Sequence, residues 1–313
     1  MAQDRPLLGI TLMLCFCILA PMGDAVAKIL STSVPIGETL LVRFGVQALV
    51  LIPIIAITRR PWRMRKRILG LVALRTALHI IGIGAMFLAL RHLPLADAVA
   101  IAFVMPFLML LLGKFVLNEE VGMRRLLACI VGFIGTLLVI QPSFVEVGPP
   151  ALLPLVVAVV FSLFMLVTRQ IAKEVDPISL QAVSGVMAVT VTLPALALGF
   201  VFDMPEMKII VPDTTTMALL LTIGLLGTAA HLLMTWSLRY APSATLAPMQ
   251  YLEIPIATLI GWIVFSDLPN GLAATGILIT IAAGLYIVFR ERAMSRAAQQ
   301  APEPLSPVDH AAE

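Results

Sequence analysis

The sequence predicts an all-α integral membrane protein, with ten transmembrane helices arranged as two inverted five-helix repeats. Composition is the first observation behind this prediction, because 60% of the 313 residues are hydrophobic and only 12% are charged. A typical soluble domain has about 25% charged residues. The apolar residues form successive windows of ~20 residues, the length of helix that crosses a hydrocarbon core about 30 Å thick. These windows are too long and too continuously apolar for the alternating strands of a membrane barrel.

The second observation is an internal duplication. Its first copy carries Leu90, Arg91, Pro94, Gly113 and Glu119, and the same residue types, with Asp for Glu, recur 148 positions later (90 + 148 = 238). The recurring positions are Leu238, Arg239, Pro242, Gly261 and Asp267. Because a unit with five crossings re-enters the bilayer upside down when it is repeated, the duplication predicts an inverted pair.

Short polar breaks divide the chain into the ten expected spans. They cover 7–29, 36–57, 68–90, 95–117, 125–141, 151–171, 178–202, 217–238, 243–265 and 272–289. This division predicts four parts: a first repeat over 1–141, a linker over 142–150, a second repeat over 151–289, and a disordered cytoplasmic tail over 290–313. The tail is expected because Ala, Gln and Pro dominate it and its charges are scattered.

Basic residues predict the orientation. With an inward N-terminus, one inner loop collects a cluster of six cations, whereas the outer side receives Arg91, Lys208 and Lys28. The cluster consists of Arg59, Arg60, Arg63, Arg65, Lys66 and Arg67. The positive-inside rule then places both termini in the cytoplasm of a multi-pass protein of the cell inner membrane. Clustered cations also attract nucleic acids and anionic lipids, but we favour the topological interpretation and expect no nucleic-acid partner.

Ionisable and polar groups inside the spans mark the candidate site. Such groups cost several kcal/mol in lipid unless they face a cavity or a partner. Candidate substrate-binding residues are Glu253, Tyr251, Gln250, Arg43, Arg75, His79, Trp236 and His231. Asp24, Lys28 and Glu38 are candidates for coupling or gating, and the four-residue spacing of Asp24 and Lys28 allows them to pair. The competing interpretations are an interfacial ion pair for Asp24 with Lys28, a helix-dipole contact for Glu38, and packing for the histidines.

The segment from Gln250 to Glu253 is the strongest candidate. Glu253 lies about ten residues into its span, too deep for easy contact with water. Pro248 and Pro255 flank the segment, and each removes a backbone hydrogen bond. We therefore expect a bent, cavity-lining stretch here. In the last span, Gly276, Thr280 and Gly284 form a rib of small residues for close helix contact.

Several stretches resemble the EamA-type carriers of the drug/metabolite transporter superfamily, over residues 7–289. They are Leu88-Ala89-Leu90-Arg91-His92-Leu93-Pro94 with Asp97-Ala98, Asn118-Glu119-Glu120, and Ser237-Leu238-Arg239-Tyr240-Ala241-Pro242. Three further stretches look like the S-adenosylmethionine uptake branch, and the bacterial riboflavin carriers share the general layout. These stretches are Tyr251-Leu252-Glu253, Val42-Arg43-Phe44 and Gly23-Asp24-Ala25-Val26-Ala27-Lys28. The first retains only part of the branch's Tyr-x-Tyr-Leu-Glu pattern, because Met249 stands where its first Tyr would be.

The resemblance implies a secondary transporter that moves a small polar, ring-bearing metabolite, similar to riboflavin or S-adenosylmethionine, by alternating access. Phosphate-loop, zinc-hydrolase and nucleophile-elbow motifs are absent from the sequence, so we expect no enzymatic activity and no cofactor. Cys15, Cys17 and Cys129 fall inside spans and suit packing better than metal binding. The alternatives are a broad-specificity exporter of amino acids or drugs, and a membrane-embedded lipid-modifying enzyme. The expected partners are the solute and the bilayer, and the protein is a monomer or a homodimer.

Overall fold

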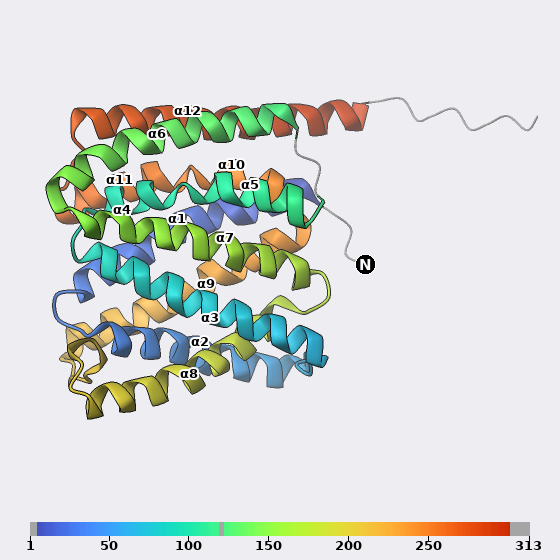
Figure 1. Ribbon diagram of the computed structural model, residues 1–313. Helices are drawn as coiled ribbons and strands as arrows, with labels where there is room; N and C mark the ends of the chain where they lie inside the picture. Colours follow the sequence, from blue (N-terminus) through green and yellow to red (C-terminus); the bar gives the residue numbers. More distant parts are fainter. Residues whose placement is uncertain (1–4, 119–121, 301–313) are drawn as a thin grey trace, which may run out of the picture.

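The computed structural model describes residues 5–118 and 122–300, and its described part consists of helices and the turns between them (Figure 1). Glu119, Glu120 and 301–313, which carried part of the expectations above, lie outside the described residues. The helices of the first half are α1 (Pro6–Leu30), α2 (Ile36–Thr58), α3 (Lys66–Leu90), α4 (Leu95–Ala102), α5 (Met105–Val116) and α6 (Met123–Val147). Those of the second half are α7 (Leu153–Ala172), α8 (Pro177–Val201), α9 (Thr214–Tyr240), α10 (Ser243–Gln250), α11 (Glu253–Phe265) and α12 (Gly271–Gln300), with 3-10 turns η1 (Pro149–Leu152) and η2 (Pro205–Met207).

The described helices have the length and polarity of membrane spans. Seven are long and apolar enough to cross a bilayer, with α4 and α5 counted as one, and three shorter apolar stretches lie in α6, α11 and α12. Large apolar side chains cover the outside of the bundle, as the 81% exposure of Ile57 illustrates. The expected class of an all-helical membrane protein is therefore confirmed.

Two of the expected spans are broken, and the breaks fall at equivalent places. Phe103 and Val104 separate α4 from α5, and Tyr251 and Leu252 separate α10 from α11. The two breaks are 148 positions apart (103 + 148 = 251), the same offset as the duplicated motif. Pro106 and Pro255 each stand near the start of the second half-helix, where the missing N–H leaves the carbonyl four residues earlier without its helical partner. The expected bend at 250–253 is thus confirmed.

The contacts between helices are reciprocal between the two halves. α1 packs on α9 and α11. Its counterpart in the second half, α7, packs on α3 and α5 in the same way. α2 pairs with its counterpart α8 at one edge of the bundle, and α6 pairs with α12 at the opposite edge (Figure 1). Each half-helix packs against a half-helix of the other half: α4 contacts α11, and α10 contacts α5.

The loops gather at two ends, which polar contacts tie together. At one end Arg60 binds Asp176 (Nη1 to Oδ1, 2.7 Å), and the first described N–H, that of Arg5, donates to the Tyr240 carbonyl. The start of α1 and the C-terminal end of α12 both lie at this end (Figure 1). At the other end, Asp213 caps α9 by accepting from Thr216 N–H, and the hydrogen bonds with Thr216 lower the pKa of this carboxyl.

Two helices continue past the apolar spans that the sequence predicts. The predicted linker over 142–150 is mostly helical, since α6 continues to Val147 and the chain turns at Gly148, whose φ of 69° suits glycine. The predicted disordered tail does not begin at residue 290, because α12 continues to Gln300. Residues 290–300 consist of Arg, Glu, Ala, Met, Ser and Gln, most of which are strong helix formers, and this propensity outweighs their lack of apolar pattern.

The small-residue rib of α12 packs closely against α6. A Cβ on Gly135 of α6 would lie 2.6 Å from the Gly276 carbonyl oxygen and would also meet the Thr280 hydroxyl. We therefore expect Gly135→Ala to destabilise the protein by roughly 1–3 kcal/mol, because a backbone oxygen cannot move aside easily. Thermal unfolding in detergent measures this effect.

Gly45, in the middle of α2, provides the control, since a Cβ there has no heavy atom within 4 Å. Gly45→Ala should leave the unfolding temperature unchanged or raise it, because Ala favours a helix over Gly by ~1 kcal/mol. Equal unfolding temperatures for the two variants would mean that α6 and α12 do not pack this closely.

Candidate functional site

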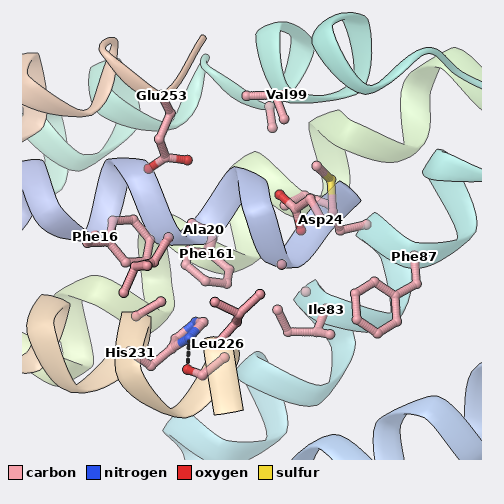
Figure 2. Close-up of a pocket in the computed structure, with 18 of the residues that line it drawn as sticks. Phe16, Ala20, Asp24, Ile83, Phe87, Val99, Phe161, Leu226, His231 and Glu253 are labelled. Atoms are coloured by element: carbon pink, nitrogen blue, oxygen red, sulfur yellow. Dashed lines mark hydrogen bonds between the residues drawn. The ribbon is translucent and has the colours of Figure 1, made fainter. Parts of the chain in front are cut away.

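A cavity lies between the two halves, beside both helix breaks. Water-sized molecules can reach about 80 Å³ of its interior, and the space that atoms leave free, its opening included, is about 740 Å³. α1 runs along one wall, and α3, α4, α7, α9 and the start of α11 supply most of the rest. Polar lining groups are few: Asp24, Arg43, His231 and Glu253. Figure 2 shows Glu253 and Asp24 reaching the cavity from different helices, with His231 opposite them.

Three charged side chains share this apolar space. Glu253 is 7% exposed and is the first residue of α11, where a helix N-terminus favours a negative charge. Its Oε1 atom has no hydrogen-bond partner within the described residues. Asp24, in α1, and the buried Arg43, in α2, line the same cavity as Glu253. The cavity therefore presents two carboxylates and one guanidinium, a set that suits a solute with a positive charge of its own.

His231 joins the charged groups through a single ring orientation. Its Nδ1 lies 2.9 Å from the Gly227 carbonyl oxygen, which can only accept, so Nδ1 carries the proton and donates. The contact of 3.4 Å between Nδ1 and Arg43 Nη2 then joins two donors and is not a hydrogen bond. His231 Nε2 is left as an acceptor, and neither it nor Arg43 Nη1 has a partner among the described residues. Both are polar atoms without a protein partner, in residues that line the cavity.

Aromatic rings close the cavity below His231. His79 packs against His231 with the rings tilted by 39° and their centroids 4.3 Å apart, and it also contacts Phe164 at 4.7 Å and Phe44 at 5.1 Å. His79 itself does not line the cavity, and both of its ring nitrogens lack partners in the described structure. The two predicted histidines thus lie together, one at the cavity surface and one directly behind it.

Arg75 lies behind these rings. Its guanidinium lies 4.4 Å from the centre of the Phe164 ring, and it donates to Thr168 (2.8 Å) and Ser184 (2.9 Å), with longer contacts to Gln181 and Thr235. These partners belong to α7, α8 and α9, so one side chain of the first half links three helices of the second. Arg75 is fully buried and closes the bundle on this side of the cavity.

Gln250 and Tyr251 do not line the cavity, although Glu253 does. Gln250 Nε2 faces the sulfur atoms of Met13, Met109 and Met165 at 3.3–3.9 Å. The Tyr251 hydroxyl donates to the Cys129 carbonyl oxygen (3.2 Å), and its ring packs against Phe103 and Gly132. Both side chains pack on the side of the helix break that faces away from the cavity.

Three further candidates have other partners. Lys28 does not pair with Asp24 but binds Asp267 (Nζ to Oδ2, 2.9 Å), which the turn after α11 brings to the same end of the bundle. Glu38 accepts from the Ile210 N–H, away from the cavity. Trp236 packs on a separate apolar cluster that contains Leu51 and Ile55. The predicted Asp24–Lys28 pair is therefore wrong.

Several wall residues carried no polar signal in the sequence. Phe16, Phe87 and Phe161 face the cavity (Figure 2), and Phe103 also lines it. Cys17 is buried, and its sulfur lies 3.8 Å from the Met249 carbonyl oxygen. The described residues contain no group of three His, Cys, Asp or Glu side chains that could hold a metal ion. The sequence signal for these wall residues is their spacing of four, as for Phe16, Ala20 and Asp24, which places them on one face of a helix.

The position of Tyr251 leads to a prediction that separates packing from binding. Tyr251→Leu removes a buried ring and a hydrogen bond, so it should lower the stability of the protein by roughly 1–3 kcal/mol. The apparent affinity for a transported solute should stay within about twofold of the original value, because the ring does not reach the cavity. Thermal unfolding and the KM for uptake measure the two effects. A tenfold change of KM at unchanged stability would place the ring in contact with the solute.

Comparisons with known proteins agree with this arrangement. The EamA-like transporter family matches residues 7–141 and again 149–290. A riboflavin transporter of Brucella anthropi is 30% identical over 229 residues, which are 73% of this chain and 80% of that protein. An S-adenosylmethionine uptake transporter of Rickettsia prowazekii is 24% identical over 291 residues, with coverage of 91% and 93%.

A solved structure shares the fold. This crystal structure superimposes with a TM-score of 0.67 at 18% sequence identity, and the match covers 92% of this chain and 98% of the other. Such low identity supports the fold alone. The two family matches together span nearly the whole chain and coincide with its two halves, α1 to α6 and α7 to α12. The chain belongs to the EamA-like transporter family.

Proposed function

We propose that the protein is a secondary carrier that moves a small, ring-bearing, polar metabolite across the cell inner membrane by alternating access. The observation that carries this proposal is the cavity between the two halves, with Asp24, Arg43, His231 and Glu253 beside both helix breaks. Discontinuous helices at the interface of two repeats are where carriers of this kind hold their solutes. No enzymatic step is part of the proposal.

The lining residues support a specific division of roles. Glu253 and Asp24 bind the positive part of the solute, while Arg43 and the acceptor nitrogen of His231 bind its polar or negative part. Phe16, Phe87, Phe103 and Phe161 provide faces on which a flat ring stacks. The riboflavin and S-adenosylmethionine transporters among the relatives make these two metabolites the first candidates. Two carboxylates favour the second, since its sulfonium group carries a positive charge.

The position of the cavity supports an outward-facing state. Asp24 and Phe87 lie near the C-terminal ends of α1 and α3, at the end of the bundle that also carries the 91–94 and 202–213 loops. The cavity therefore occupies that half of the bundle. Arg75 and its partners fill the other half, beside the basic loop 59–67 that the positive-inside rule assigns to the cytoplasm. Alternating access would then require the Arg75 contacts to separate while the half near Asp24 closes.

The topology that we propose has ten membrane crossings, and its two repeats are inverted with respect to one another. It is supported by the reciprocal helix contacts, and by α1 and α7, which run in opposite directions in Figure 1. Reporter fusions after Arg65 and at the C-terminus should both report a cytoplasmic location, and a fusion after Met204 an external one. A cytoplasmic signal after Met204 would contradict this topology.

The function is tested with purified protein in proteoliposomes loaded with one candidate solute. External labelled S-adenosylmethionine or riboflavin should accumulate by counterflow against the same internal solute, and the preferred solute should raise the unfolding temperature in detergent by mass action. Liposomes with the Glu253→Gln variant provide the control for leakage. If neither metabolite gives counterflow or a thermal shift, neither of them is the solute.

A further inference from the structure

A second, larger hollow lies on the lipid-facing edge of the bundle, remote from the central cavity. It is a groove of about 1,310 Å³, its open side included, between the end of α2 and the first turns of α8. Its walls are apolar and partly exposed: Ile52, Ile55, Ala56, Ala182, Val183, Val186 and Met187. We call this hollow the α2–α8 groove. Since α2 and α8 form one edge of the bundle (Figure 1), the groove faces the hydrocarbon of the bilayer.

The mouth of the groove is basic and aromatic. Arg59, Arg60 and Trp62 line it, immediately after α2 ends. Arg59 takes a left-handed conformation (φ 51°) that ends the helix, and its side chain is exposed. Trp62 is 61% exposed, and tryptophan favours the depth of the lipid headgroups.

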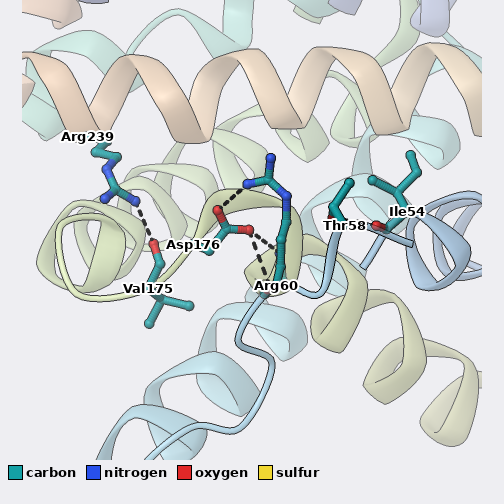
Figure 3. A network of polar contacts seen from close by, with 7 residues as sticks. Ile54, Thr58, Arg60, Val175, Asp176 and Arg239 are labelled. Carbon is teal, nitrogen blue, oxygen red and sulfur yellow. Dashed lines mark hydrogen bonds and ion pairs between the residues drawn. The ribbon is translucent and has the colours of Figure 1, made fainter. Parts of the chain in front are cut away.

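Arg60 is held in place by one acid. Its Nη1 binds Asp176 Oδ1, as Figure 3 shows, and Asp176 also caps α8 through the Ser179 N–H. Arg60 Nε has no hydrogen-bond partner among the described residues. Because Asp176 is already engaged twice, the nearby cluster of six cations over 59–67 keeps this end of the groove positive.

We propose that the α2–α8 groove binds one anionic glycerophospholipid, with an acyl chain along the apolar walls and the phosphate at Arg59 and Arg60. The combination of an acyl-sized apolar trough with a basic mouth at one interface fits this ligand class. A second copy of the chain fits less well. A two-fold contact through this face would bring the two Arg59 clusters together, and like charges at an interface repel.

The test uses Trp62 as a built-in reporter. The protein has three tryptophans, and replacing Trp236 and Trp262 by Phe leaves Trp62 as the only one. The variant in detergent is titrated with lipids whose acyl chains carry bromine, which quenches Trp fluorescence on contact. Brominated phosphatidylglycerol should reach half-maximal quenching at a mole fraction at least fivefold lower than brominated phosphatidylcholine. Equal quenching by the two lipids would overturn the proposal.

Two arginine variants show whether a site or the general charge of the loop is responsible. Arg59→Gln should reduce the preference for phosphatidylglycerol by about fivefold, the factor that corresponds to ~1 kcal/mol per basic residue near an anionic surface. Arg67→Gln removes the same charge from an exposed residue outside the groove and should change the preference by less than twofold. Equal losses in the two variants would mean that the loop attracts anionic lipids without a defined site.

Filling the groove tests the apolar part of the proposal. Ala56 is exposed on α2, so Ala56→Phe should fold normally and abolish the difference between the two lipids. An unchanged difference would contradict an acyl chain in the groove. Trp62 emission that depends on protein concentration but not on the headgroup would assign this face to a second copy and overturn the proposal. Both outcomes are independent of the transported solute.

Discussion

We expect Glu253→Gln to lower transport by roughly 10- to 150-fold while the protein still folds and inserts. Glutamine keeps the size of the side chain and most of its hydrogen bonding, but it removes the charge at the first residue of α11. A hydrogen bond to a charged group contributes about 1.5–3 kcal/mol, and each 1.4 kcal/mol is a factor of ten. Initial rates of counterflow in proteoliposomes, at equal amounts of inserted protein, measure the loss.

Glu38→Gln is the matched control for this substitution. Glu38 is a carboxylate of similar burial, 6% against 7% for Glu253, but it binds the Ile210 N–H and does not reach the cavity. The control should therefore keep its transport rate within about twofold. A Glu253→Gln protein with normal transport would show that the cavity needs no charge at this position, and Asp24→Asn would then be the next variant to examine.

The sequence was sufficient for the all-helical membrane class and for the two repeats, because these signals are local or periodic. Apolar windows marked the helices, and the 148-residue offset paired the two halves. Pro255 marked the bend before Glu253, and the depth of Glu253 in its span indicated an inward-facing charge. These inferences need only the spacing of residues along one helix and the cost of a charge in lipid.

The differences concern contact partners that the sequence cannot place and helices that extend beyond the apolar spans. Lys28 binds Asp267, which is 239 residues away in the sequence, and does not bind Asp24, which is one helical turn away. Tyr251 lies only two residues before Glu253, but it stands in the helix break, so its ring turns toward Cys129 instead of the cavity. The helices that end at Val147 and Gln300 are longer than expected, because hydropathy detects the segment inside the lipid and does not detect helical residues that continue past the membrane.

We expect Arg75→Met to open the half of the bundle that Arg75 closes. Methionine keeps most of the apolar length but donates no hydrogen bonds, so the contacts of α3 with Thr168 and Ser184 are lost. Two hydrogen bonds from a buried cation are worth about 1.5–3 kcal/mol each. If part of this free energy favours the closed state, the population of the open state should rise by at least about tenfold.

The opening can be measured through a reporter cysteine on α8. Leu180 is fully buried in an apolar cluster with Val72 and Ile171 in the same half of the bundle, so Leu180→Cys in a background without the three native cysteines reacts only when this half opens. Arg75→Met should increase its rate of labelling by a water-soluble maleimide at least about tenfold. Arg63→Gln, an exposed arginine of the neighbouring loop, should leave the rate unchanged. Equal labelling rates in the two variants would mean that Arg75 stabilises the bundle without controlling its opening, because the loss of a purely structural contact lowers the unfolding temperature and does not favour one open state.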